Sequence, residues 1–321
     1  MINWVLKYNI QIPVVKCLTD HKILCIVKLI KYVYPVGKLS VNIILFHFSK
    51  SYPEQVIMDI NNKNSEELVL IQITDLHIFT NKNEEFAGVN SSRSLQAVLS
   101  LIKRDFSDFD VMLATGDLVQ DPEQAAYKNM LKLLSVIDQP IYYLPGNHDD
   151  PELMEEILGD HFVKNLSLNN WEIIFLNSYK PGTHSGYLKQ EALISHDERL
   201  KNIKDSNILI CLHHHPVSIE SAWMDSIMLE NPEDLFRILD KYDNVKGMIW
   251  GHIHQEFSQI RNNMLLMGSP STCAQFLPHA KQFATDSLQP GYRWLKLMKD
   301  GRIESGVERI NPQHYHEDIQ D

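Results

Sequence analysis

Acidic, amide and imidazole side chains gather in five short clusters along this chain. Such side chains bind transition metals and move protons in enzymes. The clusters read DLH, GDLVQD, GNHD, LHHHP and GHIH, at 75–77, 116–121, 146–149, 212–216 and 251–254. Each one alone is weak, because an Asp-x-His pair or a run of histidines is often an ordinary polar loop. Their combination in one chain favours a shared site.

The candidate ligands in these clusters are two carboxylates, one amide and four imidazoles: Asp75, His77, Asp117, Asn147, His213, His252 and His254. This mixture suits manganese, iron or zinc better than calcium, which prefers oxygen ligands alone. Seven ligands exceed the needs of one tetrahedral site, but they match two ions that share a bridging carboxylate. Asp117 is the expected bridge, because Gly116 before it permits close approach. Two such ions can clamp a phosphoryl group.

The clusters follow segments that we expect to be buried strands. These apolar segments are 68–74, 110–114, 141–144, 207–212 and 245–250. Helical spacing at 91–106 and 232–242, and a proline-initiated helix from 122 toward 136, indicate an α/β fold. Loops after the carboxyl ends of strands are where such folds place their sites. We therefore expect the five clusters to converge at one edge of a sheet core.

With these motifs in place, the chain resembles the calcineurin-like metallophosphoesterases. The resemblance implies a four-layer α/β/β/α sandwich around two divalent ions, with iron or manganese expected first and zinc as an alternative. Position by position, it implies that one ion takes Asp75, His77, Asp117 and His254. The other ion would take Asp117, Asn147, His213 and His252. It further implies that a bound phosphoryl group meets His77, Asp117, Asn147, His148 and His254.

Two further segments narrow the resemblance. SPSTCAQFLPH at 269–279 and PGYRWLKL at 290–297 are similar to the bacterial class III 3′,5′-cyclic-nucleotide phosphodiesterases that act on cyclic AMP. This similarity covers about 58–311 and implies hydrolysis of 3′,5′-cyclic AMP to 5′-AMP. Three alternatives stay open: a 2′,3′-cyclic nucleotide, a nucleotide pyrophosphate or a phospholipid head group as substrate. A protein phosphatase is disfavoured, because the GDxxDRG pattern is absent. A non-catalytic metal-binding module is disfavoured by the complete ligand set.

The leaving oxygen in such a reaction needs a proton or a charged donor. His148 is the candidate, because it adjoins Asn147 but lies outside the ligand set. Asp149 is expected either to orient His148 or to be an exposed loop carboxylate. His214 and His215 are expected to be structural or to support the ligands. His148 and Asp117 are thus the expected catalytic residues.

Composition limits the partners of this chain. A net charge of −11 argues against a nucleic-acid binder, because phosphate backbones need a basic footprint. A small-molecule cyclic nucleotide remains compatible, since bound metal ions dominate the local charge. The four cysteines show no paired spacing, so a reduced cytoplasm is the expected location. The oligomeric state stays open between a monomer and a homodimer.

The charge is unevenly distributed. Residues 1–57 carry seven lysines against Asp20 and Glu54, and the rest of the chain is strongly acidic. This apolar, basic segment contributes no candidate ligand. We expect an N-terminal extension at 1–57, a catalytic domain at 58–311 and a polar tail at 312–321. Membrane association is expected only through 1–57, if at all, and the extension is expected to be dispensable for catalysis.

Overall fold

The computed structural model describes residues 67–311 continuously, together with five short strands that precede them. Four of these strands belong to a first unit, Met1–Ser51, and form two antiparallel pairs. Their bounds are β1 (Val15–Thr19), β2 (Lys22–Ile26), β3 (Tyr32–Val33) and β4 (Leu39–Ser40). The predicted tail at 312–321 and the rest of the predicted extension lie outside the described residues.

The second unit contains a mixed five-stranded sheet in the order β10-β9-β6-β17-β18. Its strands are β6 (Glu67–Ile73), β9 (Val111–Thr115), β10 (Ile141–Leu144), β17 (Gly291–Met298) and β18 (Ile303–Arg309). Strands β6, β9 and β10 are parallel, and the β17–β18 hairpin adds antiparallel strands beside β6. The carboxyl ends of the three parallel strands therefore meet at one edge.

A seven-stranded sheet has the order β15-β16-β14-β13-β12-β11-β5. Its strands are β5 (Val56–Met58), β11 (Asn165–Leu168), β12 (Trp171–Leu176), β13 (Asn207–Leu212), β14 (Val245–Trp250), β15 (Phe257–Arg261) and β16 (Met264–Gly268). Strands β12, β13, β14 and β16 are parallel. Their apolar runs are buried on both faces, as the sequence of a central parallel strand requires.

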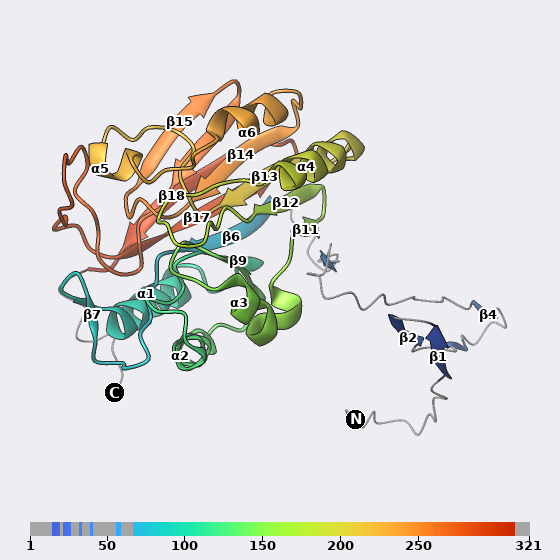
Figure 1. Cartoon of the computed structure of the whole chain (residues 1–321), viewed down its shortest axis with the longest axis horizontal. Helices are drawn as coiled ribbons and strands as arrows, with labels where there is room; N and C mark the ends of the chain where they lie inside the picture. Colours follow the sequence, from blue (N-terminus) through green and yellow to red (C-terminus); the bar gives the residue numbers. More distant parts are fainter. Residues whose placement is uncertain are drawn as a thin grey trace. The chain divides into compact units, whose positions relative to one another are not determined.

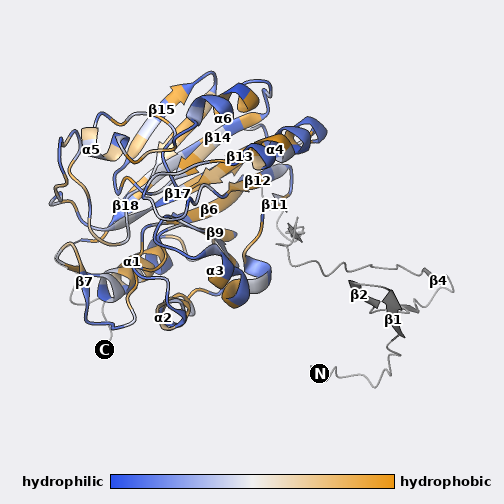
Figure 2. Cartoon of the chain, in the orientation of Figure 1, coloured by the Kyte–Doolittle hydropathy of each residue, from blue (hydrophilic) through white to orange (hydrophobic). Residues whose placement is uncertain are grey.

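Helices cover the outer face of each sheet. α1 (Ser91–Asp105), α2 (Gln124–Leu134) and α3 (Pro151–Leu158) share one apolar cluster with the five-stranded sheet. α4 (Gln190–Asn202), α5 (Ala222–Asp225) and α6 (Pro232–Leu239) share another with the seven-stranded sheet. A third cluster fills the space between the sheets. The layers and their apolar strands are visible in Figures 1 and 2. The predicted α/β/β/α sandwich is confirmed.

Local sequence explains why these elements form. In α1, the predicted face of Leu95, Val98, Leu99 and Ile102 is buried, and Asn90 caps the helix by accepting from the Arg93 amide at 2.9 Å. Strand β6 alternates, so that Leu68 and Leu70 face the other sheet while residues 71 and 73 face the helices. The 3.6-residue and two-residue periods thus assign each side chain to a layer.

The boundary predicted at residue 58 falls within β5, which pairs in parallel with β11. The contact pattern divides the chain after Ser51, so Val56–Met58 belongs to the second unit. The domain boundary stays a prediction, and a chain beginning at Tyr52 would keep β5 intact. Among the described residues, the structure contains no helix that is both long enough and apolar enough to cross a membrane.

Candidate metal centre

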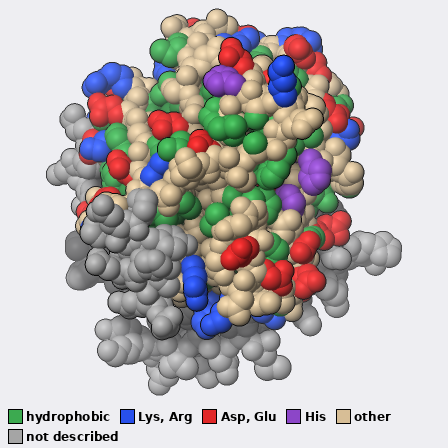
Figure 3. Space-filling model, turned by 90° about the vertical axis from the view of Figure 1, so that its left-hand side faces the viewer, with side chains coloured by type: hydrophobic (Ala, Val, Ile, Leu, Met, Phe, Trp, Pro, Cys, Tyr) green, Lys and Arg blue, Asp and Glu red, His purple; other side chains and the backbone are tan. Residues whose placement is uncertain are grey.

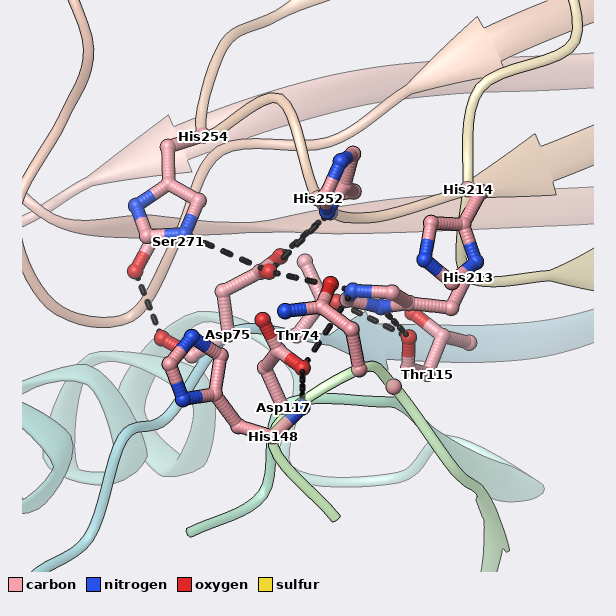
Figure 4. A network of polar contacts seen from close by, with 12 residues as sticks. Thr74, Asp75, Thr115, Asp117, His148, His213, His214, His252, His254 and Ser271 are labelled. Atoms are coloured by element: carbon pink, nitrogen blue, oxygen red, sulfur yellow. Dashed lines mark hydrogen bonds and ion pairs between the residues drawn. The ribbon is translucent and has the colours of Figure 1, made fainter. Parts of the chain in front are cut away.

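The five predicted clusters lie together where the strands of both sheets end. Asp75 and His77 follow β6, Asp117 follows β9, and Asn147 follows β10. His213 follows β13, while His252 and His254 follow β14. Figure 4 shows most of these side chains turned toward a common centre. The sequence predicted one edge of a sheet core, and the structure forms the site from the facing edges of two sheets.

Ligand atoms from the two sheets approach one another closely. His254 Nε2 lies 3.3 Å from Asp75 Oδ1, and His213 Nε2 lies 3.4 Å from Asp117 Oδ1. His77 Nε2 lies 3.2 Å from His254 Nε2 and 3.9 Å from Asp117 Oδ2. Asp75, His77, Asp117, His213, His252 and His254 are all buried. These overlapping groups of donors within 4.8 Å have the dimensions of a metal site with more than one ion.

The backbone at these positions is unusual. Five of the candidate ligands adopt positive φ angles of 48–65°, namely Asp75, His77, Asp117, His252 and His254. Non-glycine residues rarely adopt this region, and each such residue costs on the order of 1–3 kcal/mol. Backbone hydrogen bonds hold the turns in place, with the Asp75 amide donating to Gly116 O and the His77 amide to Asp117 O at 2.9 and 3.0 Å. The fold therefore retains strain where the candidate ligands lie.

Two glycines allow the loops to approach. A side chain at position 146 would collide with the backbone and carboxylate of Asp117. One at position 251 would collide with Thr74 and with the Asp75 carboxylate. The glycines in the GNHD and GHIH clusters are thus required by the contact between loops, since only a hydrogen fits there.

Each candidate histidine ligand has one ring nitrogen committed to a hydrogen bond. His77 Nδ1 donates to Gln120 Oε1, His213 Nδ1 to Thr115 O, His254 Nδ1 to Ala274 O, and His252 Nε2 to Ile227 O, at 2.7–3.1 Å. Carbonyl and amide oxygens only accept, so these bonds fix the proton on the named nitrogen. In His77, His213 and His254 the other nitrogen, Nε2, lies 3.2–3.4 Å from another candidate ligand atom. This is how second-shell oxygens orient metal-ligating imidazoles.

The unpaired polar atoms fit a metal. Within residues 67–311, His213 Nε2 and Asn147 Oδ1 are buried and have no hydrogen-bond partner. Buried polar atoms are rarely left without a partner, unless an ion or ligand completes them. His77 and His254 also turn two Nε2 atoms toward one another at 3.2 Å, and a shared cation relieves the repulsion between their lone pairs. The buried His and Asp clusters thus indicate a binuclear metal site.

Titration in the buried cluster follows its charges. Burial raises the pKa of Asp117, but the neighbouring His213 and His148 outweigh burial and hold that pKa well below its usual value. Burial opposes protonation of His213, yet the Asp117 and Asp75 carboxylates raise its pKa to about 9. Burial lowers the pKa of His77 to about 3. The carboxylates are therefore ionised and His77 is neutral, whereas His213 is protonated without a metal and would release its proton on binding one.

His148 lies beside the candidate ligands His77 and Asp117. Its ring nitrogen Nδ1 donates to Gln120 O at 3.0 Å, and its ring is 5.1 Å from that of His77. Gln120 therefore orients both His77 and His148, one through its side chain and one through its backbone. Sequence reasoning did not single out Gln120, although it stands three residues after Asp117 in the GDLVQD cluster.

The two predicted roles of Asp149 are both wrong. Its side chain is 2% exposed and accepts from the amides of Gly146, Leu118 and Val119, at 2.8–3.3 Å, and from the Tyr127 hydroxyl at 3.1 Å. It therefore joins the GNHD loop to the GDLVQD loop instead of orienting the His148 ring. A carboxylate near buried backbone amides satisfies those amides and fixes the spacing of the loops.

The remaining histidines of the LHHHP cluster support the site. Both ring nitrogens of His214 are engaged, with Ser178 Oγ at 2.8 Å and with His184 O at 3.1 Å. His184 in turn bonds through Nδ1 to Asn147 Nδ2 at 3.2 Å, which leaves Asn147 Oδ1 for a metal. His215 is buried, 3.5 Å from Asp225. No motif marks His184 in the sequence, because it stands alone in a polar loop.

A cavity of about 240 Å³ opens onto the candidate ligands. Besides His77, Asp117, Asn147, His252 and His254, its lining includes Phe86, Trp223, Phe276 and Phe283. The face shown in Figure 3 lies on the side of Figure 1 that carries α5 and β7 (Glu85–Phe86), and it bears hydrophobic side chains with histidines among them. The site can therefore admit a small molecule to the metal centre.

Comparison with known proteins agrees with this geometry. Residues 68–256 match the model of the calcineurin-like phosphoesterases. The chain belongs to the calcineurin-like phosphoesterase family. A 3′,5′-cyclic adenosine monophosphate phosphodiesterase of Pseudomonas aeruginosa is 37% identical over 76% of this chain and 90% of its own length. A 3′,5′-cyclic-nucleotide phosphodiesterase of Nostoc sp. is 38% identical over 75% of this chain and 92% of its own.

The fold of the family is also found in solved structures. A dimetal phosphatase from Danio rerio superposes with a TM-score of 0.54 at 16% identity, covering 76% of this chain and 99% of that one. At this identity the likeness shows the fold alone. The likeness in fold and the buried donor atoms are two separate observations, and both are consistent with a metallophosphoesterase.

If Asp117 bridges two ions, the Asp117→Ala variant should abolish phosphoesterase activity and lower bound metal from about two ions per chain to fewer than one, because the loss of a bridging ligand weakens both sites. Metal analysis of the purified protein, together with turnover of an artificial diester, measures both effects. Asp121→Ala is the matched control, since Asp121 is an exposed carboxylate of the same loop. Near-normal turnover by Asp117→Ala with two metals bound would contradict the bridging role.

Proposed function

We propose that this calcineurin-like phosphoesterase is a dinuclear-metal phosphodiesterase that hydrolyses 3′,5′-cyclic AMP to 5′-AMP. The main support is the buried cluster in which imidazole lone pairs and two carboxylates face one another within hydrogen-bond distances. The substrate is proposed because relatives at 37–38% identity carry names that specify cyclic nucleotides. The cavity beside the cluster, with its aromatic lining, suits a nucleotide.

We assign Asp75, His77, Asp117 and His254 to one ion, and Asp117, Asn147, His213 and His252 to the other. Asp117 is the proposed bridge, because its carboxylate approaches His77 on one side and His213 on the other, at 3.9 and 3.4 Å. We propose iron or manganese, with zinc as an alternative, because the donors mix imidazole and carboxylate. Two bound ions would supply Lewis acidity and a water that ionises near neutral pH.

The chain's own residues would position the substrate around this centre. His148 shares a group with His77 and Asp117 whose ligand atoms lie within 4.8 Å of one another. Its Nδ1–H is committed to Gln120 O, so Nε2 is the nitrogen available to the phosphoryl group. As an imidazolium, His148 would donate from Nε2 to the departing 3′ oxygen or to a phosphoryl oxygen. Asp117 Oδ1 accepts a hydrogen bond from the His148 amide at 2.9 Å, which fixes the position of His148 relative to the proposed bridging carboxylate.

The His148→Ala variant should lose about 10²–10⁴-fold in turnover, the usual contribution of a positioned general acid. Its metal content should stay close to that of the unmodified protein. His161→Ala is a suitable control, because His161 is an exposed histidine that bonds to Ile141 O outside the site. If the lost activity is accounted for by lost metal, His148 is itself a ligand and the donor role is wrong.

The substrate proposal predicts that the metal-loaded enzyme converts 3′,5′-cyclic AMP to 5′-AMP, not to 3′-AMP. On this proposal the bond from phosphorus to the 3′ oxygen breaks, and His148 would supply the proton that the 3′ oxygen takes up. Chromatography of the products from 3′,5′-cyclic AMP, cyclic GMP and 2′,3′-cyclic AMP measures this. Fast cleavage of an artificial diester without turnover of cyclic AMP would leave a metallophosphoesterase with another substrate, such as a pyrophosphate or a phospholipid head group.

A further inference from the structure

Aromatic rings extend outward from two of the candidate metal ligands. The Phe86 ring stacks on His77 at a centroid distance of 3.9 Å and an interplanar angle of 3°. The Phe276 ring stacks on His254 at 3.8 Å and 8°. Trp223 and Phe283 contact Phe276 edge to face, each within 5.4 Å, and also contact each other at 5.4 Å. We call Phe86, Trp223, Phe276 and Phe283 the aromatic wall.

Backbone pairing holds this wall in place. Residues 276–285 fold back on themselves through a bridge between Phe276 and Thr285 and a hydrogen bond of 2.8 Å from the Leu277 amide to Ala284 O. The Ser221 hydroxyl donates to Ala280 O at 3.1 Å, which ties this turn to the segment that carries Trp223 in α5. The part of the wall formed by Trp223, Phe276 and Phe283 is thus preorganised, and preorganisation lowers the entropic cost of binding a ligand.

The residues of the aromatic wall are suited to binding a ligand with a flat, apolar face. Apart from the candidate ligands, His148 and His184, the described residues that line the cavity are all apolar or aromatic. They are Phe86, Trp223, Met224, Ile227, Phe276 and Phe283. The Phe283 side chain is 57% exposed although it is large and apolar. Exposed apolar surface at the mouth of a polar site commonly marks a place where a ligand binds. Aromatic side chains bind nucleobases by stacking, which every base can provide.

We propose that the aromatic wall is a nucleobase subsite, in which Phe283 stacks on the base of a nucleotide whose phosphate is held at the metal centre. This inference deepens the proposed function and rests on it for the phosphate position. Purines should bind more tightly than pyrimidines because their stacking area is larger, while discrimination between adenine and guanine should be weak. A ligand with a phosphate and a sugar but no base leaves the wall uncovered.

The test measures binding to the full-length, manganese-loaded protein by titration calorimetry, so that turnover is not needed. The ligands are 5′-AMP, 5′-GMP, 5′-UMP and ribose 5-phosphate. We expect 5′-AMP to bind at least about tenfold more tightly than ribose 5-phosphate, the effect of one stacked base. Phe283→Ala should reduce this ratio to about twofold without changing the affinity for ribose 5-phosphate.

Leu277→Ala is the matched control, because Leu277 is an exposed apolar residue of the same turn that does not line the cavity. It should keep the full ratio. Phe283→Leu retains apolar area but removes the ring, so an intermediate ratio would separate stacking from simple burial. Melting temperatures of the variants show whether each one folds, and Phe283 is exposed enough that its truncation should leave them unchanged.

The outcomes separate this inference from the proposed function. Equal affinities for 5′-AMP and ribose 5-phosphate, or a ratio that survives both Phe283→Ala and the double variant Phe283→Ala/Trp223→Leu, would overturn the subsite. That result would leave cyclic AMP hydrolysis untouched. Conversely, a base-dependent affinity that Phe283→Ala removes, in a protein that does not turn over cyclic AMP, would uphold the subsite and reject the proposed substrate.

Discussion

Burial of two carboxylates among four imidazoles is the constraint on which this structure depends. Asp75 and Asp117 are almost completely removed from water, and burial together with the Asp117 carboxylate raises the pKa of the neighbouring Asp149 to about 6. The effective cost of burying one ion is several kcal/mol even after relaxation. Hydrogen bonds from the His252 and His148 amides compensate for part of that cost. Divalent cations bound between the carboxylates and imidazoles would compensate for the remaining cost of burying the two charges.

The arrangement of the two sheets brings the candidate ligands together. Parallel strands of both sheets end at the same place, so residues far apart in sequence meet without long loops. Five candidate ligands have a left-handed backbone conformation, which is energetically unfavourable. Packing of the apolar layers on either side compensates for this cost. Gly146 and Gly251 then let the loops touch.

Periodic patterns in the sequence were enough to predict the central elements. Strands β6, β9, β10, β13 and β14 and helix α1 lie where their apolar periods placed them, within about two residues. The place of β17 in the sheet could not be predicted in this way. Its apolar alternation indicates a strand, but it does not indicate that the strand pairs with β6 and not with β16. The same holds for α4, whose polar sequence buries only Leu193 and Leu200.

At the site, residue types predicted the cluster but not its supports. Asp149 was misjudged because burial and three backbone amides, which sequence does not show, decide its role. His184, Gln120 and the aromatic wall depend on loops whose course is set by tertiary contacts.

The most direct measurement is the structure of manganese-loaded crystals, with anomalous scattering to locate the metal. For a binuclear centre bridged by Asp117 we expect two peaks roughly 3.5–4 Å apart, with the Asp117 carboxylate in contact with both. A single peak, or two peaks that Asp117 does not join, would contradict the binuclear centre.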